Sequence, residues 1–142
     1  MPPSKLPPEF RRGRSVVSLL HAHLVFIPKY RRGVFDAALL AATEAVMSEV
    51  CADFGVTLVE FNGEDDHVHL LVEYPPTVQL SRLVNSLKGV SARVLRRDHP
   101  SLVRKFLWGS HFWSPSYFVG SVGGAPFDVL RTYIEQQRTP TA

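Results

Sequence analysis

The chain has 142 residues, of which 45% are apolar and 11% aromatic, which suffices for one domain with a single core. Sixteen Lys and Arg against 13 Asp and Glu give a net charge of +3, which is compatible with a polyanionic partner. Its one cysteine, Cys51, excludes an intramolecular disulfide, and no segment has the roughly 18 apolar residues of a membrane span, so we expect a cytoplasmic protein without membrane contact.

The N-terminal residues 1–14 contain four prolines and no apolar periodicity, which predicts a flexible basic tail. Residues 15–142 are expected to form a single domain. That domain opens with the β-branched and apolar run SVVSLLHAHLVFI, which is typical of a largely buried strand. The following segment, KYRRG, predicts a basic loop.

A helical pattern follows from residue 35 to residue 54, and Gly55 supplies the stop signal. Two strand-like segments come next, at 56–61 (VTLVEF) and 67–74 (HVHLLVEY). The turn-forming residues NGEDD separate them and predict an antiparallel hairpin.

The segment 78–97 has its apolar residues on one face and its cations on the other, which predicts a basic amphipathic helix. Residues 112–122 (FWSPSYFVGSV) are strand-like, and Pro115 within them favours an edge strand. Pro126 is placed to begin a last helix, which we expect to run to about residue 138.

The order of the predicted elements is β, α, β, β, α, β, α. It indicates an α+β fold of the ferredoxin-like or RRM-like kind, an antiparallel sheet with helices packed on it. The last helix is an addition to that arrangement. Strand order is taken from the analogy, because the pattern alone does not determine topology.

Two histidines, His67 and His69, alternate with apolar residues in the second strand of the hairpin. Side chains two residues apart in a strand share a face, so both imidazoles can bind one divalent cation. Two protein ligands leave coordination positions open, as a catalytic metal requires. The alternative is that both histidines decorate a solvated surface.

A second His-x-His pair, His21 and His23, lies in the first strand. No carboxylates are placed to bridge two metal ions there, so we expect a lesser role for it. Asp66 precedes the first pair and either orients an imidazole or belongs to the turn.

In the last helix, Tyr133 and Gln137 are four residues apart and therefore share a face. The amide of Gln137 can give an oxygen ligand to a metal, beside the hydroxyl of Tyr133. Packing on the helix surface would explain the same spacing.

Several segments resemble the HUH single-tyrosine transposases, the TnpA type encoded by small insertion sequences that move as single-stranded DNA. They are DHVHLLVEY, SRLVNSLKGVSARVLRR, LWGSHFWSPSYFVGSVGG and YIEQQ, in the order of the family. The similarity runs from about residue 15 to residue 138. It implies an enzyme that cleaves and rejoins single-stranded DNA through a 5′-phosphotyrosine.

The resemblance also implies a role for each candidate residue. Tyr133 would be the nucleophile, and His67, His69 and Gln137 would hold Mg²⁺ or Mn²⁺. The family further implies recognition of DNA hairpins near the element ends. It implies a homodimer in which the last helix of one protomer can complete the site of the other, and the glycines that precede this helix suit a mobile connection or a tight turn.

Basic and aromatic side chains offer a surface for DNA, with a solvated helix face and a packed strand as the alternatives. The cations expected to contact DNA are Arg14, Lys29, Arg31, Lys88 and Arg93. The aromatic residues that could stack on unpaired bases are Phe112, Trp113 and Tyr117.

Three other functions compete with a transposase. A non-catalytic module that binds single-stranded nucleic acid would need neither the paired histidines nor the Tyr-x-x-x-Gln spacing. A metal-dependent phosphohydrolase is disfavoured, because its further histidine motifs are absent from the sequence. The sequence does not exclude the third function, a domesticated endonuclease that cuts repeated hairpins.

Overall fold

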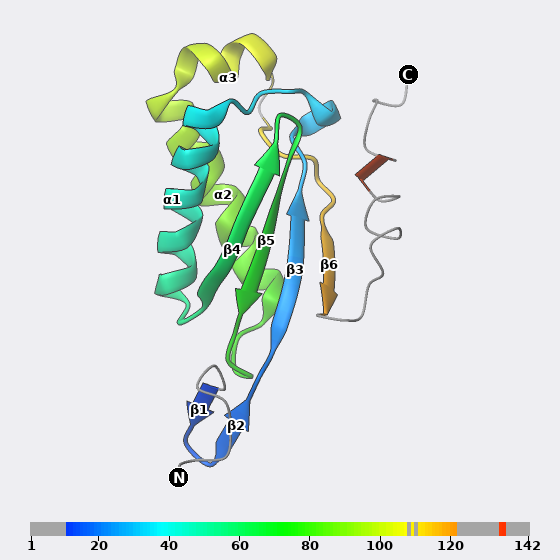
Figure 1. Ribbon diagram of the computed structural model, residues 1–142. Coiled ribbons are helices and arrows are strands. Elements are labelled where there is room, and N and C mark those ends of the chain that lie inside the picture. Colours follow the sequence, from blue (N-terminus) through cyan, green and yellow to red (C-terminus); the bar gives the residue numbers. More distant parts are fainter. Residues whose placement is uncertain (1–10, 108, 110, 122–133, 136–142) are drawn as a thin grey trace.

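The computed structural model describes residues 11–107, 109, 111–121 and 134–135. Its centre is a four-stranded antiparallel sheet with the order β4-β5-β3-β6 (Figure 1). The strands are β3 (His21–Phe26), β4 (Thr57–Glu64), β5 (His67–Glu73) and β6 (Phe118–Ser121). The units β3-α1-β4 and β5-α2-β6 interleave in the sheet. Strand β5 lies between β3 and β4, and strand β3 lies between β5 and β6. This interleaving confirms the predicted ferredoxin-like fold.

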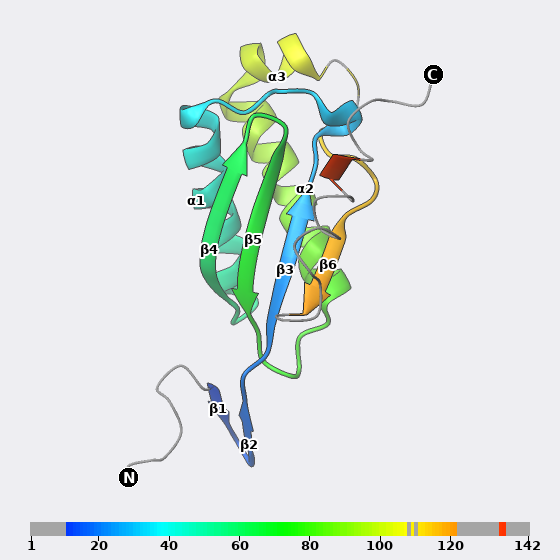
Figure 2. The ribbon, with the colours of Figure 1, turned by 45° about the vertical axis from the view of Figure 1, so that its right-hand side comes forward.

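Two long helices, α1 (Ala37–Asp53) and α2 (Leu80–Asp98), cover one face of the sheet (Figures 1 and 2). Asp36 caps α1 by accepting a hydrogen bond from the Leu39 amide at 2.8 Å. Val68, Leu70 and Val72 point from β5 into the core beneath the helices, as their alternation predicted. None of the helices in the described residues has the length and apolar character needed to cross a bilayer.

Several segments differ from the sequence-based expectation. The predicted basic loop contains a 3-10 turn, η1 (Lys29–Arg31), and the unpredicted helix α3 (Pro100–Phe106) follows α2. The predicted strand 112–122 is a strand only in β6, with an isolated bridge between Pro28 and Trp113. Pro115 explains the interruption, because it has no amide hydrogen for a ladder.

The predicted first strand is also divided, into β2 (Val16–Ser18) and β3, because β2 pairs with β1 (Arg11–Gly13) in a separate hairpin. The predicted tail, residues 1–14, thus overlaps β1 at its end, while residues 1–10 lie outside the described residues. Arg11 donates two hydrogen bonds of 2.7 Å to the carboxylate of Glu73. This bidentate pair attaches the hairpin to the end of β5.

Gly63 of β4 lies in close contact with a side chain of α1 and with the neighbouring strand. A Cβ atom there would lie 2.7 Å from Leu40 Cδ2 and 2.9 Å from the His67 carbonyl oxygen. We expect Gly63→Ala to lower the free energy of unfolding by about 1–3 kcal/mol, because the His67 backbone would have to move.

Urea denaturation of Gly63→Ala and of a matched control measures this effect. Gly89 lies in α2, and a Cβ atom there would meet nothing within 4 Å. Gly89→Ala should therefore stabilise the protein by up to about 1 kcal/mol. Equal midpoints for Gly63→Ala and the unmodified protein would contradict the close approach.

Candidate active site on the histidine face

The sheet face opposite α1 and α2, called the histidine face below, has two His-x-His pairs on neighbouring strands. In the register of β5 with β3, His69 lies opposite Val25 and His23 lies opposite Leu71. In the register of β4 with β5, Glu64 lies opposite His67. The polar side chains that the three strands present on this face are His21, His23, Thr57, Glu60, Asn62, Glu64, His67, His69 and Glu73.

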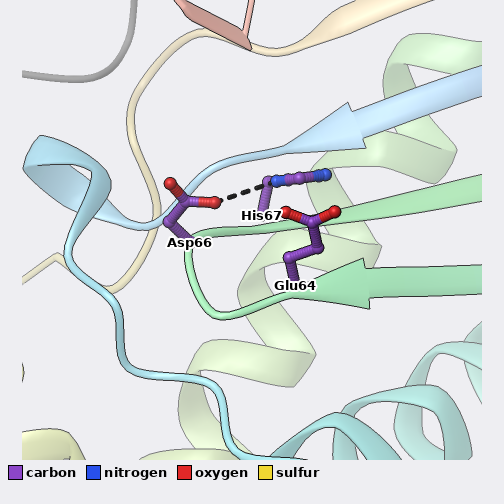
Figure 3. Close-up of side chains that lie close together, drawn as sticks. All are labelled: Glu64, Asp66 and His67. Atoms are coloured by element: carbon purple, nitrogen blue, oxygen red, sulfur yellow. Dashed lines mark hydrogen bonds and ion pairs between the residues drawn. The ribbon is translucent and has the colours of Figure 1, made fainter.

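His67 belongs to a compact group of possible metal ligands at the end of the β4–β5 hairpin. Glu64, Asp66 and His67 each place one donor atom so that all three atoms lie within 4.8 Å of one another. Figure 3 shows the three side chains close together, with Asp66 linked to the imidazole of His67 and the carboxylate of Glu64 on another side of that ring. Imidazole and carboxylate donors suit Mn²⁺, and the oxygens suit Mg²⁺, so this donor set fits the predicted metals.

The loop at residues 29–35 holds the turn of this hairpin. The Phe35 amide donates a hydrogen bond of 3.0 Å to the Asp65 carbonyl oxygen. Arg31 Nε forms an ion pair with Asp66 Oδ2, and Asp66 Oδ1 lies 3.0 Å from His67 Nδ1. The site is therefore built from β4, β5 and the loop that follows β3.

His69 contacts His23 rather than the carboxylate group. His69 Nε2 lies 2.9 Å from His23 Nδ1, and the two rings share a hydrogen bond. Burial, and then the nearby His23 and His67, lower the pKa of His69, which favours the neutral imidazole that a metal ion needs. A metal ion could bind Nε2 of His69 only if the contact between this atom and Nδ1 of His23 were broken.

Two of the predicted DNA-contacting cations have partners within the protein. Arg31 is engaged with Asp66, and its side chain is only 11% exposed. Lys88 donates hydrogen bonds to the carbonyl oxygens of Ser114 at 2.7 Å and Pro115 at 3.3 Å, and burial lowers its pKa. Lys88 thus positions the segment before β6.

The remaining predicted cations lie nearer to solvent. Arg14 and Arg93 are exposed, and Lys29 is half-buried. Lys29 lines a pocket of about 280 Å³ with Tyr30 and Arg32, and this pocket also contains His111. An adjoining pocket of about 330 Å³ is lined by further cations, Arg96 and Arg104.

The aromatic residues considered for base stacking are mostly in the core. Phe112 is 1% exposed and Trp113 is 5% exposed. Trp113 Nε1 donates a hydrogen bond of 2.9 Å to Ser91 Oγ. The packed-strand alternative is therefore correct for these two residues, and Tyr117 is half-buried. Tyr30, in contrast, is 50% exposed.

The predicted nucleophile Tyr133 and the predicted ligand Gln137 lie outside the described residues. The neighbouring segment 134–135 is helical, and Figure 2 places it on the side of the sheet opposite α2. Sequence reasoning did not identify Glu64 as a possible ligand or Arg31 as a partner of Asp66. The period-two alternation of the hairpin strands could have placed Glu64 on the same face as His67. Nothing in the sequence indicates that Arg31 pairs with Asp66.

Comparison with known sequences identifies close relatives. Residues 16–137 match the family model described as "Transposase IS200 like". The ISDra2 transposase TnpA of Deinococcus radiodurans is 33% identical over 132 residues, which cover 93% of this chain and 94% of the relative. The transposase of insertion sequence element IS200 from Salmonella typhimurium is 34% identical over 101 residues, 71% of this chain and 66% of the relative.

Two solved structures have a similar fold. A crystal structure from Deinococcus radiodurans, provisionally assigned as a transposase, superposes with a TM-score of 0.81 at 29% identity. The superposition covers 92% of this chain and 99% of that one. A REP-associated tyrosine transposase bound to a REP hairpin has a TM-score of 0.56 at 10% identity, over 88% of this chain and 68% of that one.

Proposed function

The chain belongs to the IS200-like transposases, and from this membership we propose that it cleaves and rejoins single-stranded DNA at the ends of an insertion sequence. The observation that carries the proposal is the placement of His67 and His69 on one face of β5, with the possible ligand Glu64 close to His67. A module that only binds nucleic acid would not need the paired histidines.

We propose that His67, His69 and Gln137 hold one Mg²⁺ or Mn²⁺ ion. When bound, such an ion supplies Lewis-acid stabilisation of charge on a phosphate oxygen. The protein contributes imidazoles held on paired strands, and the lowered pKa of His69 favours the neutral form of that side chain. Gln137 comes from the last helix, outside the described residues.

Tyr133 is the proposed nucleophile. Its phenol oxygen forms a bond to phosphorus as the bond from phosphorus to the 3′-oxygen breaks. The tyrosine loses its proton, and the departing 3′-oxygen gains one. The 5′ end of the DNA is left as an ester of Tyr133, and attack by another 3′-hydroxyl reverses these changes to join the strands. Residues 134–135, which follow Tyr133 in the chain, are helical and lie on the histidine side of the sheet (Figure 2).

The test uses a single-stranded oligonucleotide that carries one end of the element flanking the gene. Incubation with Mn²⁺ should give a covalent adduct of protein and DNA that survives denaturing electrophoresis. Excess chelator should prevent the adduct. A protein that binds the oligonucleotide tightly but forms no adduct under any condition would be a binding module, and the proposed reaction would be wrong.

We propose that DNA near the element ends contacts the basic pocket beside η1. Tyr30 is exposed there, with Lys29 Nζ and the Arg32 guanidinium 5.5 and 5.9 Å from its ring centroid. An exposed aromatic ring flanked by cations suits an unpaired base and its phosphate. The exposed Arg14 and Arg93 are proposed as additional phosphate contacts.

Tyr30→Ala is expected to weaken binding of single-stranded DNA by about 1–3 kcal/mol, the usual contribution of one stacked base. Lys29→Gln should instead reduce the slope of log affinity against log salt by about one. Fluorescence anisotropy over a range of salt concentrations measures both effects. Affinities and slopes equal to those of the unmodified protein would locate the DNA elsewhere.

We further propose that the working unit is a homodimer, because each site has one tyrosine and two element ends must be exchanged together. Mixing a His67→Ala/His69→Ala protein with a Tyr133→Phe protein tests its arrangement. If the last helix docks on the partner, one of the two mixed sites is intact and activity returns in part. Docking within one protomer would leave every site defective, and sedimentation of only a monomer with hairpin DNA would exclude the dimer.

A further inference from the structure

Asp66 is held at both of its carboxylate oxygens. Oδ1 lies 3.0 Å from His67 Nδ1, and Oδ2 forms the ion pair with Arg31 Nε. The side chains of Arg31, Asp66 and His67 are 11%, 16% and 15% exposed, so all three lie largely out of solvent. A carboxylate with both oxygens engaged is better placed to orient a ligand than to be one.

The contact with Asp66 determines which nitrogen of His67 carries the proton. An ionised carboxylate only accepts hydrogen bonds, so His67 Nδ1 must donate. The neutral imidazole then keeps its lone pair on Nε2, which is the atom left for a metal ion. In this way Asp66 selects the tautomer and restrains the ring.

The backbone that presents Arg31 is in an unfavourable conformation. Tyr30 has φ 60° and Arg31 has φ 52°, two successive non-glycine residues in the left-handed region. Such strain persists only where the surrounding structure enforces it, and it concentrates at functional sites. The same loop is attached to the hairpin turn by the hydrogen bond of 3.0 Å from the Phe35 amide to the Asp65 carbonyl oxygen.

Gly33 completes this close fit. A Cβ atom at Gly33 would lie 3.1 Å from Asp65 Oδ2, so the loop passes tightly over the hairpin turn. The strained turn thus aims a largely buried guanidinium at Asp66. A DNA phosphate would have to displace Asp66 to reach Arg31 Nε.

We propose that Arg31 and Asp66 are positioning residues that fix His67 as the Nδ1–H tautomer with Nε2 directed to the metal ion. The inference rests on the proposed metal-dependent function and deepens it. Arg31, which the sequence suggested as a DNA contact, acts through Asp66 instead.

The first test needs neither metal nor DNA. Nitrogen-15 NMR of the imidazoles in the metal-free protein should show His67 protonated at Nδ1. In Asp66→Asn, the population should shift toward the Nε2–H form. An Nε2–H tautomer in the unmodified protein would overturn the proposal. Because this readout is independent of DNA cleavage, it stands even if the proposed reaction fails.

The second test measures Mn²⁺ affinity by titration with electron paramagnetic resonance. Asp66→Asn and Arg31→Gln should each weaken Mn²⁺ binding about 10–100-fold, as loss of a partner that orients a ligand does. Arg31→Lys should recover little, because an ammonium cannot reproduce the Nε contact. Lys105→Gln, which removes the charge of an exposed lysine in α3, is the control and should leave Mn²⁺ affinity unchanged.

Other outcomes separate the alternatives. If Asp66→Asn abolishes Mn²⁺ binding while Arg31→Gln has no effect, Asp66 is a ligand and the positioning role is wrong. If Arg31→Gln weakens DNA binding but not Mn²⁺ binding, Arg31 is a DNA contact after all. If a variant fails to fold, the nitrogen-15 NMR measurement of the His67 tautomer in the unmodified protein still tests the proposal.

Discussion

Tyr133→Phe is expected to abolish formation of the covalent adduct while leaving hairpin DNA binding nearly unchanged. The substitution removes one oxygen atom, and no other group on a phenylalanine ring can form a phosphoester. Loss of an enzyme's nucleophile lowers its rate by several orders of magnitude, here about 10³-fold or more. Single-turnover cleavage measures the rate, and anisotropy with an uncleavable hairpin measures binding.

Tyr117→Phe is the matched control for this variant. The ring of Tyr117 packs against Phe26 at 6.3 Å between centroids, and its hydroxyl has no assigned part in the reaction. We expect cleavage close to that of the unmodified protein. Mass spectrometry of the adduct after proteolysis should identify a peptide containing Tyr133. A DNA-linked peptide containing Tyr30 or Tyr117 would refute the assignment of the nucleophile.

The sheet and its two long helices were predictable because their signals are local. The alternation of β5 placed Val68 and Leu70 in the core and His67 and His69 on the other face, as the structure confirms. The helix stop at Gly55 is equally local, since its φ of 71° suits glycine. Periodicity and turn residues carry such information within one segment.

The contacts that build the site were not predictable in the same way. Arg31 and Asp66 are 35 residues apart, and His23 and His69 are 46 apart. Their proximity depends on strand order and on the strained turn at Tyr30, which no periodic pattern encodes. The sequence therefore predicted the histidines as candidate ligands and Arg31 as a DNA contact, but not the ion pair between Arg31 and Asp66.

Tertiary packing also determines which aromatic residues of the segment 112–117 are buried. As a sequence, it suits either a base-stacking surface or a packed strand. Ser91 of α2 accepts a hydrogen bond from the indole of Trp113 in the core, and Lys88 of the same helix holds the carbonyl oxygen of Ser114. Contacts with a helix more than 20 residues away in the chain thus accompany the burial of Phe112 and Trp113.

His67→Ala and His69→Ala are each expected to lower the rate of metal-dependent cleavage about 10²–10⁴-fold, because loss of a Lewis acid removes several kcal/mol of transition-state stabilisation. Single-turnover rates over a range of Mn²⁺ concentrations test this. A variant that has lost one ligand should regain part of its rate at high Mn²⁺, whereas a variant with a damaged fold should not.

His21→Ala provides the control on the same face of the sheet. His21 lies opposite Glu73 in the register of β3 with β5, at the end of the sheet away from the β4–β5 turn. Its loss should therefore leave the Mn²⁺ dependence unchanged. In His69→Ala, the imidazole of His23 loses its partner at 2.9 Å and becomes available to the ion, so this variant should retain more activity than His67→Ala. Undiminished cleavage by the unmodified protein in excess chelator would show that the histidines do not serve a metal ion.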